Sequence, residues 1–165
     1  MKTKKIAFLG LCIACAMILS YVEAILPPIL TAVPGIKIGL PNIVIVFLLY
    51  RFSIKEAAAV SCIRIVLSSL LFGNLAMMMY SLGGAFLSLL IMCLLKRINF
   101  FSSVGVSVAG AVCHNLGQIM VAALVLKTLQ IGYYMIVLSI TGSIAGVLIG
   151  ILAAAVLRSL KKVRI

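Results

Sequence analysis

The sequence contains no aspartate, and its acidic side chains are only Glu23 and Glu56 among 165 residues. This shortage excludes chemistry that depends on paired carboxylates, and it excludes aspartate-rich magnesium sites. The chain also lacks a Gly-x-x-x-x-Gly-Lys-Ser/Thr loop, so it has no phosphate-binding motif with which to power transport by ATP. Its single histidine, His114, cannot make a metal site without further ligands nearby. The sequence therefore predicts no enzyme, no metal site and no cofactor.

Apolar residues dominate the chain. They make up 65% of it, while the formal net charge is +12. A soluble globule needs more polar surface than this composition supplies, so the chain is expected to lie in membrane lipid. The basic residues occur in short clusters between apolar runs, a pattern typical of topology signals and not of a nucleic-acid-binding surface. We expect a single integral membrane domain over residues 1–165.

Apolar runs of about 20 residues mark the helices that could cross the hydrocarbon core. They predict six spans, at approximately 6–26, 38–52, 55–73, 75–95, 104–127 and 134–157. The second run is the shortest, and Pro41 near its start favours a helix that begins below the outer surface, behind an irregular lead-in. The expected fold class is an all-α membrane protein with a bundle of six transmembrane helices.

Six spans place both termini on one side, and the basic residues indicate which side. Eleven lysines and arginines fall on the face that carries the termini. Only Lys37 and Lys127 fall on the opposite face. Because segments rich in lysine and arginine stay in the cytoplasm, both termini are predicted to be cytoplasmic.

The long outer connection, residues 27–37, contains three prolines together with several apolar residues. Apolar residues are unusual in a free loop and favour a segment that folds back as a lid. An ordinary rigid turn explains the prolines equally well. Both interpretations stay open at this level.

Polar side chains inside apolar spans are rare and mark candidate functional sites. We predict that they form one outward-open cavity, lined by Glu23, Asn42, Arg64, Ser68, Asn74, His114, Asn115 and Gln118. At about 100° per residue, the last three share one face of their helix. A planar ligand with polar edges would fit such a site. The alternative is structural, with Glu23 and Arg64 as an ion pair and the amides holding helices together.

Small residues recur at every fourth position in two helices. The stripes are Gly105, Ala109, Cys113 and Gly117 in the fifth span, and Gly142, Gly146, Gly150 and Ala154 in the sixth. Such stripes let helices approach closely in lipid. The first span has a shorter version, Gly10-x-x-x-Ala14 with Ala7 one turn earlier, which could serve internal packing or a partner contact.

Three segments occur in order along the chain. They are Lys37-Ile-Gly-Leu-Pro-Asn42, then Ser61-Cys-Ile-Arg64 followed by Ser68-Ser-Leu-Leu-Phe-Gly73, then Gly110-Ala-Val-Cys-His114-Asn-Leu-Gly-Gln118. Together they resemble the Gx transporter family, often labelled heptaprenyl diphosphate synthase component I. That family is similar to the substrate-binding S components of energy-coupling factor (ECF) transporters.

The resemblance implies a multi-pass subunit of the bacterial cytoplasmic membrane that binds a small vitamin-like or cofactor-precursor molecule from outside. It also implies partners, a transmembrane coupling protein and two ATPases, which S components meet through an Ala-x-x-x-Ala motif in the first helix. The nearest match here is Gly10-x-x-x-Ala14, preceded by Ala7. Two alternatives stay open: a non-catalytic membrane partner of an isoprenoid or quinone biosynthesis enzyme, and a self-contained secondary carrier.

Overall fold

The computed structural model describes residues 2–25 and 39–160, and within these ranges the chain is helical and contains no strand. The elements are α1 (Lys2–Ile25), α2 (Asn42–Arg51), α3 (Ile54–Phe72), α4 (Leu75–Ile98), α5 (Ser103–Leu126), the 3₁₀ helix η1 (Gln130–Tyr133) and α6 (Tyr134–Ser159). The all-α class is therefore confirmed. The connection 27–37, expected to form a lid or a turn, lies outside the described residues.

Four stretches of helix are long and apolar enough to cross a membrane by length and composition: Thr3–Ile25, Leu75–Ile98, Ser103–Leu126 and Gln130–Ser159. Helix α3 has 19 residues but includes Lys55, Glu56 and Arg64. Helix α2 has 10 residues and is about 15 Å long, well short of a hydrocarbon core of about 30 Å. The structure thus supports a membrane protein with four candidate spans, and the six-span topology stays a prediction.

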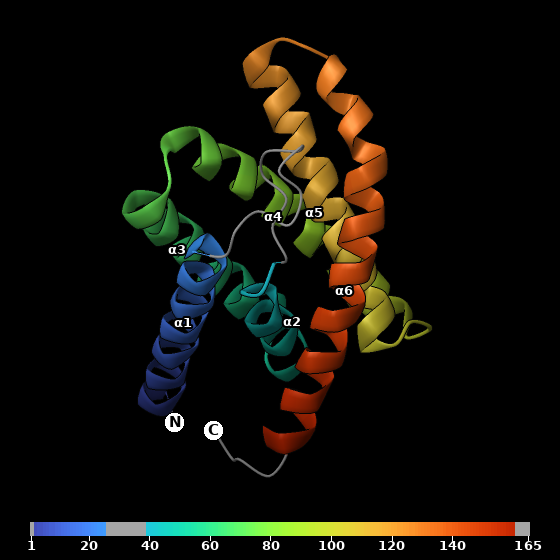
Figure 1. The fold of residues 1–165 in the computed structure, drawn as a ribbon. Helices are drawn as coiled ribbons and strands as arrows, with labels where there is room; N and C mark the ends of the chain where they lie inside the picture. The colour runs from blue at the N-terminus through green and yellow to red at the C-terminus, as the bar shows by residue number, and fades with distance from the viewer. Residues whose placement is uncertain (1, 26–38, 161–165) are drawn as a thin grey trace.

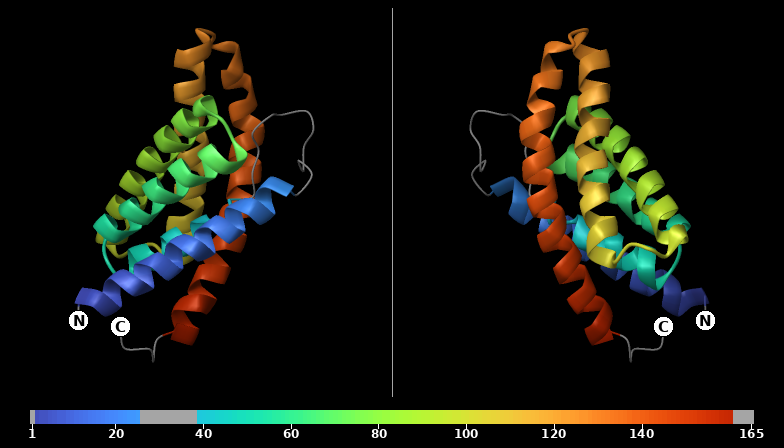
Figure 2. Two further views of the ribbon diagram at one scale, coloured as in Figure 1. Left: turned by 90° about the vertical axis from the view of Figure 1, so that its left-hand side faces the viewer. Right: turned by 90° about the vertical axis from the view of Figure 1, so that its right-hand side faces the viewer.

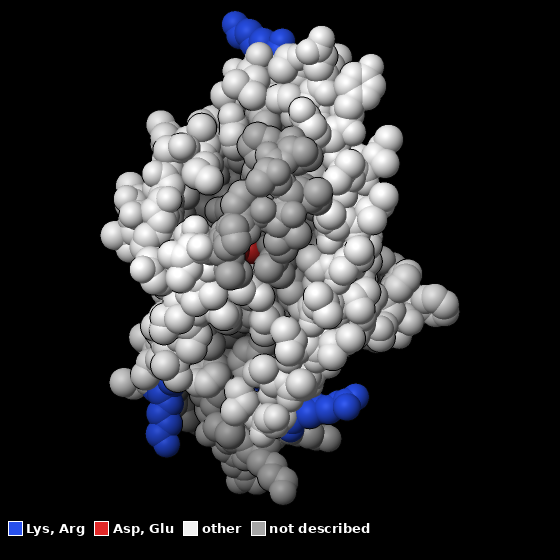
Figure 3. Space-filling view, in the orientation of Figure 1, with Lys and Arg blue, Asp and Glu red and all other residues white. Residues whose placement is uncertain are grey.

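The beginning of α1 and the end of α6 lie at the same end of the molecule (Figure 1). Helices α1, α3 and α4 run obliquely past α6 (Figure 2). In the space-filling view, the lysine and arginine side chains gather at the two ends, and the surface between them is almost free of charge (Figure 3). On the face drawn, a nearly uncharged surface between charged ends is typical of a protein embedded in lipid. Which end faces the cytoplasm stays a prediction.

The short helix α2 occupies the centre of the bundle (Figure 1). Its residues from Ile45 to Leu49 are all buried. They belong to one hydrophobic cluster to which all the other α-helices contribute, through Cys12, Ala57, Val60, Leu89, Met92, Val106, Ile149 and Ala153. Burial on all sides explains why this segment is apolar throughout and shows no polar face.

The second predicted span, 38–52, was placed too early, because α2 begins only at Asn42. Gly39 has a φ of +79°, a left-handed conformation that glycine tolerates and that a right-handed helix does not use. The Asn42 backbone N–H donates to the Gly39 carbonyl oxygen at 2.8 Å and closes a turn. Pro41 sits in this turn, where its missing donor is not needed. The irregular lead-in expected from the sequence is therefore present.

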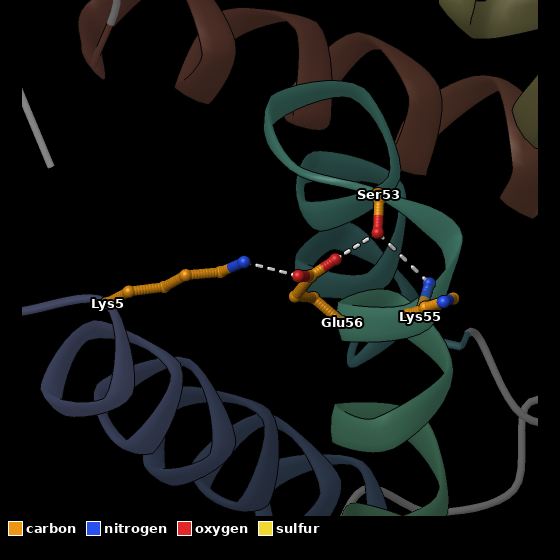
Figure 4. A network of polar contacts seen from close by, with 4 residues as sticks. All are labelled: Lys5, Ser53, Lys55 and Glu56. Atoms are coloured by element: carbon orange, nitrogen blue, oxygen red, sulfur yellow. Dashed lines mark hydrogen bonds and ion pairs between the residues drawn. The ribbon is translucent and has the colours of Figure 1, made fainter. Parts of the chain in front are cut away.

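A polar network links α1 to the beginning of α3 (Figure 4). The Lys5 ammonium donates to one carboxylate oxygen of Glu56, and the Ser53 hydroxyl donates to the other. Ser53 also caps α3 by accepting the Lys55 backbone N–H at 3.3 Å. Lys5 and Glu56 form the single ion pair within the described ranges. Because ion pairs near the surface contribute little stability, this network chiefly orients α1.

Helix α5 packs between α4 and α6. The predicted small-residue stripe of α6 is confirmed at its glycines, since a Cβ at Gly146 would lie 2.6 Å from Val108 Cα and one at Gly150 would lie 2.7 Å from Val104 Cα. Both contacts are with the backbone of α5. Glycine at these positions therefore allows the close approach that association in lipid requires.

The predicted stripe of α5 is only partly correct. Gly117 does meet α4, where a Cβ would lie 2.6 Å from the Gly83 carbonyl oxygen. The second glycine of α5 that meets α4 is Gly110, where a Cβ would lie 2.6 Å from Met92 Cγ. Gly105 does not meet α4, since the nearest atoms to a Cβ there belong to Phe101 and Ser102, at 3.6 Å or more. The contact thus repeats every seven residues, or two turns, because residues four apart drift around a helix of 3.6 residues per turn.

Candidate functional site

A cavity of about 80 Å³ begins where α2 begins. Because α2 is much shorter than its neighbours, it fills only part of the space between them, and the residues at its start line the cavity. The other walls come from the remaining five α-helices. The lining includes Ser20, Glu23, Gly39, Pro41, Asn42, Arg64, Ser68, Ser69, Phe72, Met77, Ser81, Ala111, His114, Asn115, Gln118, Gly142, Ala145 and Ile149.

The structure brings together seven of the eight residues that the sequence predicted for the cavity: Glu23, Asn42, Arg64, Ser68, His114, Asn115 and Gln118. They come from α1, α2, α3 and α5, so residues far apart in the chain converge on one space. No group of three or more His, Cys, Asp or Glu side chains that could hold a metal ion comes together in the described part of the chain. That these residues bind a ligand stays a prediction.

Asn74, the eighth predicted residue, does not line the cavity. It is the N-cap residue of α4, and its side-chain oxygen accepts the Met77 backbone N–H at 2.8 Å. An asparagine that directly precedes an apolar helix is a common cap, because it satisfies a backbone donor that the helix leaves unpaired. Its polarity is explained by the helix start alone.

Asn115 connects two helices as well as lining the cavity. Its side-chain amide donates to the Leu138 carbonyl on α6 at 2.8 Å. The bond is possible because position 142 is glycine, where a Cβ would lie 2.6 Å from the Asn115 amide nitrogen. Asn115 thus has the structural function that the sequence left open for the buried amides.

We expect Asn115→Ala and Gly142→Ala each to lower the thermal stability of the purified protein, by about 1 kcal/mol, because each removes the same interhelical hydrogen bond. The double variant should lose little more than the larger single loss. Gly132→Ala serves as the control, since a Cβ there meets nothing within 4 Å. Strictly additive losses in the double variant would contradict the shared bond.

Glu23 joins the end of α1 to the lead-in of α2. One of its carboxylate oxygens accepts the Gly39 backbone N–H. The sequence offered an ion pair between Glu23 and Arg64 as a structural alternative. Among the described residues, only Lys5 and Glu56 form an ion pair within 4.0 Å, so Glu23 and Arg64 do not form one. Glu23 and Arg64 nevertheless line the same cavity. The carboxylate therefore positions backbone at the cavity without directly bonding the guanidinium.

Arg64 lines the cavity and also carries a buried donor. Its Nε is fully buried and has no hydrogen-bond partner among the described residues. The neighbouring Ser68 hydroxyl donates to the Ile65 carbonyl of its own helix at 3.2 Å. Leaving a charged donor unpaired away from water is unfavourable, so this group is the least satisfied part of the site.

His114 and Gln118 lie against Gly84 of α4, which was not among the predicted site residues. A Cβ at Gly84 would lie 2.9 Å from Gln118 Cγ and 3.0 Å from His114 Cε1. Gly84 therefore leaves room for these polar side chains between the helices, while the adjacent Gly83 lies against Val121 and the Gly117 carbonyl oxygen of α5. The pair itself was a readable signal, since adjacent glycines inside an apolar helix often mark close packing.

Three serines of the cavity, Ser20, Ser69 and Ser81, were also missed. Ser20 precedes Glu23 by three residues, so the two share a helix face, and this spacing could have identified it. Ser69 follows Ser68 directly. Ser81 carries no comparable signal, because no predicted site residue lies beside it in α4.

Comparison with known protein families shows that a family described as heptaprenyl diphosphate synthase component I matches residues 12–156. The matched range contains every residue that lines the cavity. No curated protein and no solved structure matches the chain.

Proposed function

The chain belongs to the heptaprenyl diphosphate synthase component I family, and from this we propose that it is the substrate-binding membrane subunit, or S component, of an ECF-type transporter. Its substrate would be a small vitamin-like or cofactor-precursor molecule. The observation that carries this proposal is the cavity, on which seven predicted polar residues converge from four helices. Polar groups gathered around a space inside an apolar bundle favour ligand binding over simple helix association.

The family description names a component of a synthase, but the cavity does not favour catalysis. Glu23 is its single carboxylate, and the chain has no aspartate with which to bind the magnesium of a diphosphate substrate. We therefore propose a non-enzymatic subunit. The description itself supports the second candidate, a non-catalytic membrane partner of an isoprenoid or quinone enzyme.

The exposed side of α1 supports an interaction with another membrane protein. Ala7, Gly10 and Ala14 are all exposed, and a Cβ at Gly10 would meet nothing within 4 Å. We define these three residues as the small-residue face of α1. In the proposed complex this face contacts the transmembrane coupling protein, which in turn binds two ATPases. The subunit is multi-pass in the bacterial cytoplasmic membrane, with its termini inside.

The test is to purify the tagged chain from its native membrane in mild detergent and identify both the small molecules and the proteins that accompany it. A released vitamin-like molecule, a thermal stabilisation by that molecule, and co-purified ATPases are expected. A soluble prenyl synthase without ATPases would instead support the second candidate. Transport by the purified chain alone in proteoliposomes would indicate a secondary carrier and overturn the proposal.

A further inference from the structure

The guanidinium of Arg64 is the starting point, because its charge is permanent and its Nε has no partner. Arginine stays protonated in proteins, so burial cannot be relieved by loss of the proton. Its Nε is fully buried, without a hydrogen bond to any described residue, and the side chain lines the cavity. The guanidinium therefore brings a fixed positive charge to the cavity, and one of its N–H donors is unsatisfied.

The neighbouring polar groups of the cavity are engaged elsewhere. The Glu23 carboxylate accepts the Gly39 N–H, and the Ser68 hydroxyl donates to its own helix. The Asn115 amide donates to α6. None of these bonds is made to the guanidinium, so the described fold leaves its Nε unsatisfied. An acceptor supplied by a ligand would give the guanidinium a partner.

We propose that the molecule bound in this cavity carries an oxyanionic group, a carboxylate or a phosphate, that binds to Arg64. The inference rests on the proposed binding function and specifies its ligand class. The planar guanidinium has parallel donors that match the two oxygens of such a group, whereas a neutral carbonyl offers one oxygen. The cavity of about 80 Å³ has room for several groups of the size of water.

The test uses a planar pair that differs in charge, benzoate and benzamide, with inorganic phosphate as a second anion. The protein is labelled with ¹⁵N-arginine in detergent, and the Arg64 Nε–H resonance is assigned by its absence from Arg64→Lys. Benzoate or phosphate is expected to shift this resonance. Benzamide should bind about 10- to 100-fold more weakly, as expected for loss of a charge-assisted hydrogen bond.

Three variants test the role of Arg64, with Arg97→Lys as the matched control. Thermal stabilisation by the effective anion should be lost in Arg64→Lys and in Arg64→Gln, and retained in Arg97→Lys, because Arg97 is exposed and does not line the cavity. A response to phosphate alone assigns a phosphate ligand, and a response to benzoate alone assigns a carboxylate. If the Arg64 variants do not fold, the difference in binding between benzoate and benzamide in the unaltered protein still tests whether the cavity prefers an oxyanionic group.

Equal binding of benzoate and benzamide, no shift with either anion, or an unchanged response in a folded Arg64 variant would overturn the inference. These results are separate from failure of the proposed function. If the chain still co-purifies with ATPases and releases a neutral molecule, only the ligand class is wrong. If the chain co-purifies with no ATPase and releases no small molecule, the proposed transport function itself is wrong.

Discussion

Replacing Gly117 by alanine is expected to destabilise the protein by about 1–3 kcal/mol, the usual effect of overpacking a close contact. A Cβ at this position would lie 2.6 Å from the Gly83 carbonyl oxygen and 2.9 Å from Gly84 Cα. Both are backbone atoms, which cannot rotate away as a side chain does. Helices α4 and α5 must therefore separate, and the loss outweighs the better helix propensity of alanine, about 1 kcal/mol.

The measurement is the thermal or SDS-induced unfolding of the purified variant in detergent. Gly10→Ala is the matched control, because it makes the same change inside a helix where a Cβ meets nothing within 4 Å. It should be neutral or slightly stabilising. Equal effects at Gly10 and Gly117 would show that the α4–α5 contact is not as close as described.

The same substitution should also alter the cavity. Gly84, beside the contact, lies against the side chains of His114 and Gln118. Separation of α4 from α5 therefore moves these side chains away from the opposite wall, and ligand affinity should fall together with stability. A Gly117→Ala protein that is destabilised but binds its ligand with unchanged affinity would argue that neither side chain contacts the ligand.

Replacing Ala14 by leucine is expected to abolish co-purification of the coupling protein while leaving stability and ligand binding unchanged. Ala14 is exposed and is the last residue of the small-residue face of α1. A leucine there has room within the chain itself, but it would hold a partner helix away, since close helix contacts in lipid depend on small side chains. The quantity to measure is the amount of partner recovered per amount of tagged chain.

The control for this prediction is Ala155→Leu, the same enlargement at an exposed position of α6. It should leave partner recovery at the level of the unaltered protein. Loss of the partner in both variants would indicate a general defect in insertion. Retention of the partner in Ala14→Leu would mean that the proposed coupling protein contacts a different surface.

Helix positions could be predicted from the sequence because they follow from the lengths of apolar runs. Helix α5, for example, was expected at 104–127 and lies at Ser103–Leu126. The shortness of α2 could be anticipated from its proline, yet its position at the centre of the bundle could not. Periodicity reports which faces are apolar, and α2 is apolar on every face whether lipid or protein surrounds it.

The candidate site was predictable as a set of residues, but the contacts of its members were not. Polarity inside an apolar run identified Asn74 and Asn115 alike. Asn74 satisfies a helix start, and Asn115 bonds a carbonyl 23 residues further along the chain. The place of Asn74 directly before an apolar run was a readable cap signal, whereas the partner of Asn115 depends on how α5 and α6 pack and cannot be read from the sequence. The lack of a hydrogen-bond partner at Arg64 Nε likewise becomes visible only when the positions of its neighbours are known.

Helix α1 is tied to the rest of the protein near both of its ends, through Lys5 and through Glu23. These residues are eighteen positions apart, about five complete turns, so both leave the helix on the same side. Ala14 lies midway, about two and a half turns from each, and points the opposite way. Two ties along one side prevent a rod from rolling about its long axis. The face around Ala14 is consequently held in a fixed orientation towards the surrounding lipid.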